Sequence, residues 1–181
     1  MLHLKNITAG NPKTAEQYQM TKRHSIVWLF SEDGKNWYEE QKNFASDTIK
    51  VAYNEKGRVV WVGKDVTGIE PTNVSIIELP DITANRRITA PGFWFYRNDE
   101  FVFDYKLKAE GERDALLKQV SIMTSEWEKD LLLGLISDED REKLKAYRIY
   151  AKSLQAMDFN IITDKTSYNA IEWPVSPEAS S

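Results

Sequence analysis

The stretch GFWFYRNDEFVFDY, residues 92–105, separates two parts of the chain, because the hydrophobic pattern changes there from that of strands to that of helices. Aromatic and β-branched residues alternate on both sides of the segment RND, which is typical of two antiparallel strands joined by a tight turn. Alternate side chains of an extended chain point to the same face. We therefore expect one face with Phe93, Phe95, Phe101 and Phe103, and the other with Trp94, Tyr96 and Val102.

Upstream of this hairpin the chain reads as β-strands separated by turns. The runs TIKVAY (48–53) and RVVWVG (58–63) flank NEKG, whose glycine suits a left-handed turn, and they predict a hairpin. The run SIVWLF (25–30) is followed by Asp-Gly at 33–34, so we expect another hairpin with SEDGKNWY as turn and returning arm. The run VSIIELP ends at Pro80, which lacks an amide donor and closes a strand.

Downstream, the hydrophobic spacing changes to that of an α-helix. Apolar residues recur every three or four positions and fall on one helix face: Leu116, Val120, Met123, Trp127 and Leu131. Gly134 suits the left-handed position that ends a helix, and Ser137 suits the cap of the next one. The second helix has its own stripe: Leu144, Tyr147, Ala151 and Leu154. A connection this short makes the two helices antiparallel neighbours.

These patterns predict an α+β protein in two parts. We expect a β-hairpin-rich N-terminal domain at residues 1–105, and a C-terminal helical hairpin with an irregular Trp-Pro tail at residues 106–181. With 181 residues, of which 41% are hydrophobic and 12% aromatic, the chain is long and apolar enough to form a sizeable core.

Charge and composition exclude several classes of function. The net charge is -4 and the basic residues are scattered, so we expect no nucleic-acid partner. The chain has no cysteine, which excludes disulfides, thiolate metal sites and cysteine nucleophiles and fits a reducing cytosol. No apolar run approaches the roughly 20 residues of a membrane span or forms the core of a signal peptide, so we expect no membrane partner.

No constellation of residues predicts catalysis. His3 and His24 lie in no ligand spacing, and no glycine-rich phosphate-binding motif occurs. Asp33, Glu40 and Lys42 have a weak nuclease-like order that could hold a magnesium ion and a water, but a turn at Asp33 and a solvated hairpin arm explain these residues better. We therefore predict no catalytic, cofactor-binding or metal-binding residue, no cofactor and no enzyme. A small metal-dependent hydrolase stays as an alternative.

Aromatic and arginine side chains are the candidates for binding a protein partner. Tryptophan and tyrosine are enriched at the centres of interfaces, because they bury a large area at small entropic cost. Trp37 and Tyr38 cannot both point inward if their segment is extended. The arginine pair closes the connection DITANRR (81–87), and it pairs either within the protein or with a partner. The candidates are Trp28, Trp37, Tyr38, Arg86 and Arg87, and the helical hairpin is an alternative through Trp127, Tyr147 or Tyr150.

Five stretches in the same order resemble one known family. They are HLKNIT, PKTAEQYQM, VWLFSEDGKNWYEE, PDITANRR and EWPVSP, and together they are similar to the tail fibre assembly proteins of tailed bacteriophages and prophages. The resemblance covers nearly the whole chain, with a looser fit between Lys106 and Asp158.

The resemblance implies a chaperone and no enzyme. Such proteins act on the C-terminal part of a trimeric phage tail fibre protein and assist its folding and trimerisation in the host bacterial cytoplasm. In some relatives the chaperone stays at the fibre tip. The alternative is therefore a structural or receptor-binding component of the virion tail fibre, with a host-surface glycan as a further partner.

Overall fold

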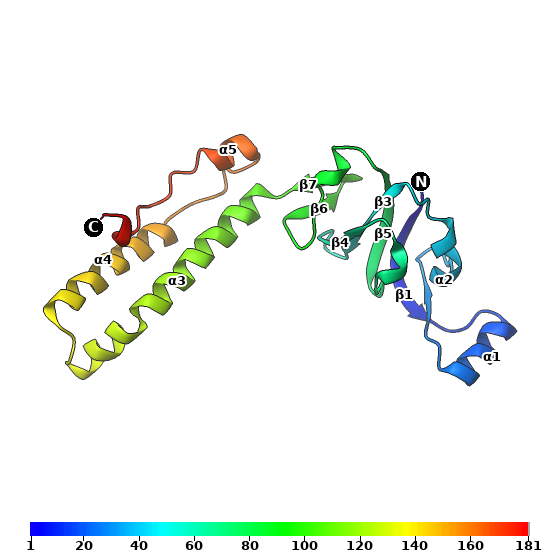
Figure 1. Cartoon of the computed structure of the whole chain (residues 1–181), viewed down its shortest axis with the longest axis horizontal. Helices are drawn as coiled ribbons and strands as arrows, with labels where there is room; N and C mark the ends of the chain where they lie inside the picture. Colours follow the sequence, from blue (N-terminus) through cyan, green and yellow to red (C-terminus); the bar gives the residue numbers. More distant parts are fainter. Residues whose placement is uncertain (181) are drawn as a thin grey trace. The chain divides into compact units, whose positions relative to one another are not determined.

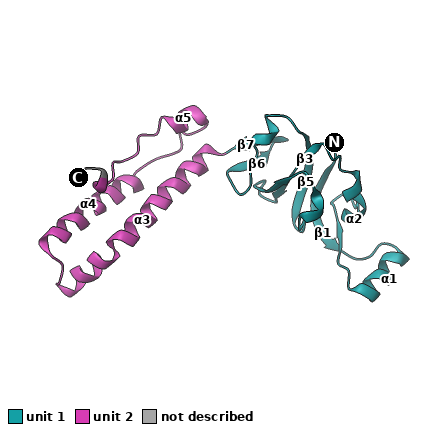
Figure 2. Ribbon diagram, in the orientation of Figure 1, with its two compact units in different colours: residues 1–103 teal, residues 104–181 magenta. Residues whose placement is uncertain are grey.

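The computed structural model describes residues 1–180, with side chains as far as Glu178. The predicted α+β class is confirmed, because antiparallel strands come first and two long helices follow (Figure 1). The chain divides into two compact units, which we describe separately (Figure 2). Unit 1 is Met1–Phe103, and unit 2 begins at Asp104.

Unit 1 is built on a five-stranded antiparallel sheet with the strand order β2-β1-β5-β3-β4. The strands are β1 (His3–Gly10), β2 (Trp28–Phe30), β3 (Thr48–Asn54), β4 (Val59–Gly63) and β5 (Val74–Pro80). The hairpin predicted for β3 and β4 is confirmed, and Gly57 in its turn has a φ of 77°. β5 pairs with both β1 and β3, so the central strands come from distant parts of the sequence.

Both faces of the central strands are buried. Successive residues of a strand point to opposite sides, and the buried residues separate accordingly into two hydrophobic clusters. Leu4, Ala52 and Ile76 belong to one cluster, whereas Ile49 and Val51 belong to the other. Burial on two sides explains why the buried residues of β3 form a continuous run, from Ile49 to Tyr53, instead of alternating with exposed ones.

Helix α1 (Ala15–His24) lies within the region that the sequence reading assigned to strands. It begins at Thr14, whose hydroxyl accepts the Gln17 amide at 3.1 Å, while Gln17 Oε1 accepts the Lys13 amide at 2.7 Å. This arrangement is close to a capping box, for which Thr-x-x-Gln is the sequence signal. The all-β reading of this region is therefore wrong, and the signal that could have corrected it is present in the sequence.

The hairpin predicted at residues 25–38 is wrong in its second arm. The turn forms, with Gly34 at a φ of 84°, but the chain then continues as helix α2 (Trp37–Glu40). The side chain of Asn36 accepts the Tyr38 amide at 3.0 Å and caps this helix. Glu39 and Glu40 lie in its first turn, where carboxylates complement the helix dipole.

The hairpin at residues 92–105 is confirmed, as β6 (Trp94–Arg97) and β7 (Glu100–Phe103), but its faces differ from the expectation. Asn98 and Asp99 both have positive φ, 51° and 62°, and form a two-residue turn. Opposite residues share a face, and the register therefore groups Trp94, Tyr96, Phe101 and Phe103 together. The expected phenylalanine face is wrong because the turn has two residues instead of three.

Unit 2 contains α3 (Tyr105–Leu133), α4 (Asp138–Gln155) and a short α5 (Lys165–Asn169). Both predicted helix ends are confirmed: Gly134 has a φ of 70°, and the Ser137 hydroxyl accepts the Asp140 amide at 3.1 Å. The core contains Val120, Tyr147, Tyr150, Ala151 and Leu154, with Trp173 of the tail packed against it. α5 is a regular element inside the tail that was expected to be irregular. None of the described helices is both long and apolar enough to cross a membrane.

Short 3-10 turns complete the described elements. They are η1 (Gln41–Asn43), η2 (Val66–Gly68), η3 (Asn85–Arg87) and η4 (Pro177–Ser180).

Candidate functional site

The five candidates for partner binding lie in unit 1 and differ in exposure. Tyr38 is 45% exposed, whereas Trp28 is 9% and Trp37 only 2% exposed. Arg86 and Arg87 are both exposed. A partner could therefore contact Tyr38 and the arginines directly, while the two tryptophans act as supports inside the unit.

Tyr38 is held in place by its neighbours although half of it faces solvent. Its ring meets the Trp28 ring edge-on, with centroids 5.8 Å apart and planes at 86°. Its hydroxyl donates a hydrogen bond to the Val27 carbonyl at 2.9 Å, and Val27 is itself 60% exposed. We call Val27, Trp28 and Tyr38 the Tyr38 patch. An aromatic anchor held in one orientation loses little side-chain entropy when a partner covers it.

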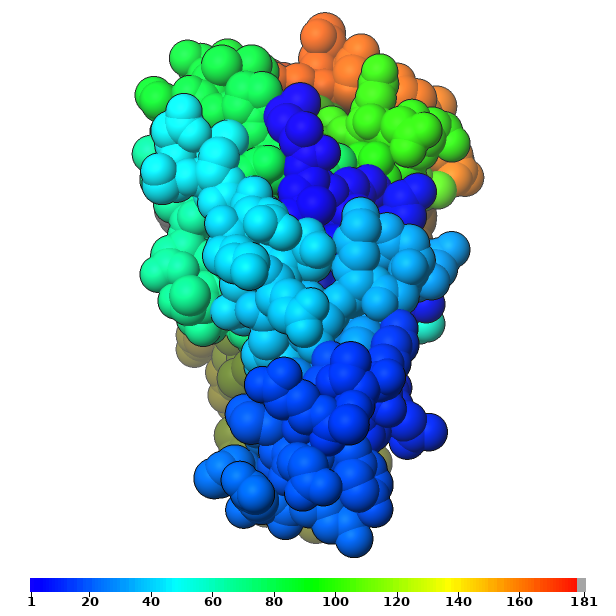
Figure 3. All heavy atoms as spheres, turned by 90° about the vertical axis from the view of Figure 1, so that its right-hand side faces the viewer, coloured from blue at the N-terminus to red at the C-terminus, as the bar shows by residue number. Residues whose placement is uncertain are grey.

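Trp28 also connects this patch to helix α1. Its indole Nε1 donates to Thr21 Oγ1 at 2.8 Å and to the Gln17 carbonyl at 3.2 Å, both on α1. Gln17 is the buried residue of this helix. Figure 3 shows unit 1 from the side on which α1 lies, and the residues of α1 form the lower end of the surface there. The position of α1 therefore depends on the Trp28 side chain.

Trp37 points into the core although its neighbour Tyr38 points outward. It packs in the cluster with Leu4, Ala52 and Ile76, and its ring lies 6.2 Å from that of Phe44. Neighbouring residues of a helix differ by about 100° in direction, which is less than in a strand but enough for Trp37 to face the core while Tyr38 faces solvent. The expectation that only one of the pair would point inward is confirmed, although the segment is helical and not extended.

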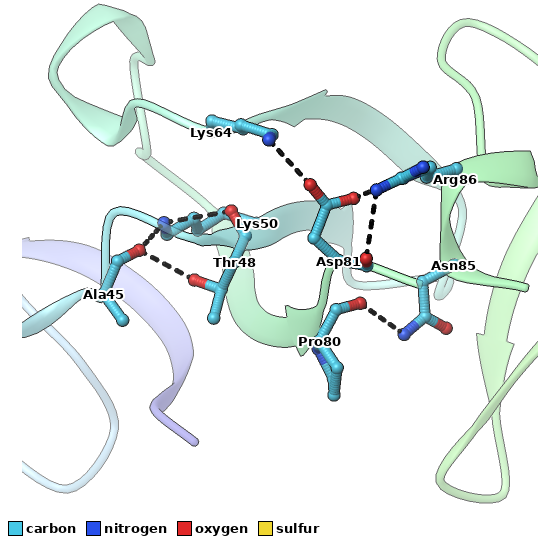
Figure 4. Close-up of polar contacts among 8 residues, drawn as sticks. All are labelled: Ala45, Thr48, Lys50, Lys64, Pro80, Asp81, Asn85 and Arg86. Atoms are coloured by element: carbon cyan, nitrogen blue, oxygen red, sulfur yellow. Dashed lines mark hydrogen bonds and ion pairs between the residues drawn. The ribbon is translucent and has the colours of Figure 1, made fainter. Parts of the chain in front are cut away.

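The connection with the arginine pair is organised around Asp81 (Figure 4). Its carboxylate contacts Lys64 Nζ at 2.6 Å and Arg86 Nε at 2.6 Å. The hydrogen bond from Arg86 and then that from Lys64 lower the pKa of Asp81 to about 2. Asn85 Nδ2 donates to the Pro80 carbonyl at 2.9 Å and ties η3 to the end of β5. Arg86 is thus used within the protein.

Arg87 differs from Arg86 in its side-chain contacts. Among the described residues, none forms a hydrogen bond or an ion pair with its side chain. It is exposed, and the next residue, Ile88, is buried in the core and fixes the chain there. Of the two arginines, Arg87 is therefore the cation available to a carboxylate on a partner.

Two buried charged side chains, Glu78 and Lys50, were not selected from the sequence and stabilise the segment between α2 and β3. Glu78, 5% exposed, accepts the Ala45 amide at 2.7 Å and Thr48 Oγ1 at 2.8 Å. Burial raises the pKa of Glu78, but the hydrogen bonds from Thr48 and the backbone, with the charge of Lys50, outweigh it and lower the pKa. Lys50, 1% exposed, donates from Nζ to the carbonyls of Ala45 and Thr48 (Figure 4). The partners of both groups lie within the fold, which indicates a structural role.

The weak nuclease-like pattern has no supporting geometry. No three histidine or carboxylate side chains of the described residues come together in a way that could hold a metal ion. Asp33 accepts Ser31 Oγ at 2.5 Å and pairs with Lys35 at 2.9 Å, and these hydrogen bonds lower its pKa. Glu40 accepts Asn43 Nδ2 at 3.0 Å. Both carboxylates therefore belong to local turn and helix structure.

His3 also has a structural position. One of its ring nitrogens lies 2.7 Å from the Tyr53 hydroxyl. Burial, followed by the charge of Lys5, lowers the pKa of His3. His24 lies at the end of α1 and is exposed. The two histidines do not form a ligand pair in this structure.

In unit 2 the structure contradicts part of the alternative docking surface. Tyr147 and Tyr150 are 5% and 8% exposed and belong to the core, so they cannot act as exposed anchors. Trp127 is half-buried against Tyr147, with ring centroids 6.0 Å apart. Instead, the end of the helical hairpin exposes four leucines that the sequence reading did not select: Leu131, Leu132, Leu133 and Leu135.

Comparison with known proteins gives a consistent result over the whole chain. A family model described as "Caudovirales tail fibre assembly protein, lambda gpK" matches residues 39–178. The chain is 45% identical to "Tail fiber assembly protein U'" of Escherichia phage P1 and 44% identical to the protein of that name in Escherichia phage Mu. It is 38% identical to "Probable tail fiber assembly protein" of Escherichia phage P2. Each match covers 98% of this chain and 100% of the relative.

Proposed function

The chain belongs to the tail fibre assembly protein family of tailed bacteriophages, and we propose that it is a chaperone for the C-terminal part of a phage tail fibre protein. In this proposal it acts in the host bacterial cytoplasm, where it assists folding and trimerisation of the fibre chain. The observation that carries the proposal is the full-length similarity to relatives whose names state a role in tail fibre assembly.

The proposed role has a physical basis in the way intertwined trimers form. Strand pairing between distant residues and different chains is slow, because the entropy of bringing them together is lost before the contacts form. Unpaired strand edges and apolar side chains stay exposed during this time and favour aggregation. A partner that covers them reversibly raises the yield of correctly assembled trimer, and such covering needs no catalysis.

We place the docking surface for the fibre on unit 1, with two separate contact points. One is the Tyr38 patch beside the edge strand β2, and the other is Arg87, whose connection is tied through Asp81 to Lys64 after β4, the opposite edge strand. Tyr38 offers a half-exposed aromatic ring with a fixed orientation. Arg87 offers a cation without an internal partner among the described residues. Tyrosine and arginine are, with tryptophan, the residue types enriched among those that dominate the binding energy of protein interfaces. Trp28 and Trp37 contribute indirectly, as supports of Tyr38 and of the core.

Co-expression of the fibre chain with and without this protein tests the proposed function. We expect soluble fibre trimer, measured by size-exclusion chromatography with light scattering, only when this protein is present. Equal trimer yield without it would refute the chaperone proposal. Its presence on purified virions in a fixed ratio to the fibre would instead identify it as a structural component of the tail.

Two substitutions test the docking surface. Tyr38→Ala and Arg87→Ala should each lower the trimer yield. Tyr18→Ala is a matched control, because Tyr18 is 50% exposed on α1 and its ring contacts Lys22, with no ring contact to Trp28. A normal yield with both patch variants would move the docking surface elsewhere without affecting the chaperone proposal.

A further inference from the structure

The two edges of the five-stranded sheet in unit 1 differ in how far the chain itself covers them. At β2, Phe30 forms a bridge with Asn36, and the Tyr38 hydroxyl donates to the Val27 carbonyl at 2.9 Å. The segment that leads into α2 therefore closes this edge. The other edge is β4, which pairs in the sheet with β3 alone as far as the chain is described.

The outer side of β4 is open beyond its first residue. Its start is held by the bridge between Arg58 and Phe95 and by the Tyr96 amide, which donates to the Gly57 carbonyl at 2.7 Å. For residues 60–63, the described part of the chain provides no bridge and no further hydrogen bond on this side. Every second residue of an antiparallel strand directs its amide and carbonyl away from its partner. This stretch therefore has backbone groups that an added strand can pair with.

Basic side chains predominate at the start of this open edge. In the turn before β4, Lys56 and Arg58 outnumber Glu55 and give a net charge of +1. Arg58 is exposed and forms no ion pair with another described residue. This cation is available to a carboxylate of a strand that lies along β4.

Basic side chains also predominate at the end of β4. Asp81 lies between Lys64 and Arg86 (Figure 4), and Asp65 caps η2. Together with the exposed Arg87, three cations stand against two carboxylates, again a net charge of +1. Both ends of the open edge are thus positive in a chain whose net charge is -4.

These charges oppose pairing of the edge with a second copy of itself. In an antiparallel pair of identical strands centred on Trp61, Arg58 of one copy lies opposite Lys64 of the other, because both are three residues from Trp61. Like charges directly opposite each other destabilise a strand pair, whereas opposite charges stabilise it. The complementary strand is therefore one with carboxylates near its two ends.

We propose that an extended, acidic segment of the tail fibre chain adds along β4 as a further strand of the sheet, an inference that rests on the proposed function. Its backbone pairs with the outward amides and carbonyls of residues 60–63. Its carboxylates face Arg58 at one end and the basic group with Arg87 at the other. Val60, which is 43% exposed, adds an apolar contact. In this way the sheet covers a fibre strand that would otherwise pair with the wrong chain.

Hydrogen exchange of the full chain, alone and in the complex isolated after co-expression with the fibre chain, tests this inference. The outward amides of residues 60–63 should exchange at least about tenfold more slowly in the complex, while the amides of β3 keep their rates. An intact complex without this protection would overturn the inference. The chaperone proposal would stand in that case, because trimer yield tests it separately. Protection that appears in the chain alone as its concentration rises would identify a second copy as the occupant and would also overturn the inference.

The sign of a charge at position 60 gives a second test. Val60→Asp should lower the amount of fibre chain that co-purifies with the tagged protein about fivefold, because it places a like charge beside an acidic strand, whereas Val60→Lys should retain binding. Val102→Asp is the matched control, since Val102 is 36% exposed on the edge strand β7 of the two-stranded sheet, and it should leave binding unchanged. An equal loss in both Val60 variants, with wild-type thermal melts, would overturn the acidic character assigned to the fibre segment.

Discussion

Replacement of Trp28 by phenylalanine should loosen helix α1 selectively. The indole Nε1–H is shared between Thr21 Oγ1 at 2.8 Å and the Gln17 carbonyl at 3.2 Å, so the substitution removes one good hydrogen bond and one weak one. The Gln17 carbonyl keeps a hydrogen bond from Thr21 Oγ1 at 2.9 Å and is not left without a partner. The net loss from hydrogen bonding is therefore about 1 kcal/mol.

The smaller ring adds a packing term. Trp28 is only 9% exposed, and the lost ring area costs about 1 kcal/mol more. A total of about 2 kcal/mol corresponds to a roughly 30-fold rise in the population of the state in which α1 has opened. Gln17 is the buried residue of α1, so few other contacts compensate for this loss. The strands of the sheet have separate contacts and should be affected much less.

Hydrogen exchange measured by mass spectrometry tests this expectation. Amides of Ala15–His24 should exchange about 30-fold faster in Trp28→Phe, whereas amides of β3 keep their wild-type protection. Tyr18→Phe is the control on the same helix and should change neither. Unchanged protection of α1 would refute the role given to Trp28. An equal acceleration in β3 would show that Trp28 stabilises the whole unit instead of holding one helix.

Three further predictions concern stability. Leu154→Ala empties a site that is fully buried in unit 2 and should lower the free energy of unfolding by about 2–5 kcal/mol, seen in thermal melts of the helical circular dichroism signal. Gly57→Ala should lower the free energy of unfolding by more than about 1 kcal/mol, because Gly57 has a φ of 77° and an added Cβ would collide with the Tyr96 carbonyl oxygen. Urea unfolding, followed by tryptophan fluorescence, measures this free energy. The pKa of Asp81, measured by NMR, should be about 2, below the usual 3.8. Its ion pairs should therefore stabilise the fold fully above pH 3.8, and this contribution should be lost as the pH falls towards 2. Asp81→Asn should remove this acid dependence of the free energy of unfolding.

Turns, helix ends and helix caps could be predicted from the sequence, because each requires a particular type of residue. Gly57, Gly134 and Ser137 occupy the turn, helix end and helix cap expected of them, because each residue type satisfies a local need of the backbone. The stripe of α4 was predicted correctly for the same kind of reason. Its residues Leu144, Tyr147, Ala151 and Leu154 are all buried.

Register and short helices were harder to predict. The faces of the β6–β7 hairpin depend on whether the turn has two or three residues, and a change of one residue moves each side chain of a strand to the other face. α2 has only four residues, which is too short for a repeating hydrophobic pattern. The capping residue Asn36 is the signal in the sequence that indicates this helix. α1 shows the opposite case, because its signal at Thr14 and Gln17 was readable in the sequence.

The exposure of individual side chains could not be predicted, because it depends on contacts between distant segments. Trp37 is buried through residues of β1, β3 and β5, none of which is its neighbour in sequence. Arg86 and Arg87 look equivalent in the sequence, and only the position of Asp81 separates them. The leucines at 131–135 continue an apolar stripe in the sequence, and the end of α3 leaves them exposed.

The distinction between supporting and contacting residues decides how variants of the proposed docking surface should be interpreted. A Trp28 or Trp37 variant could lower fibre trimer yield by moving Tyr38 or by loosening the core, since both tryptophans are buried. Such a loss would not show that either residue touches the fibre. Tyr38 and Arg87 are exposed and fill no part of the core, so their truncation removes a surface contact and leaves the fold intact. A loss of trimer yield in these two variants, with hydrogen exchange of α1 and β3 unchanged, is therefore the result that identifies the docking surface.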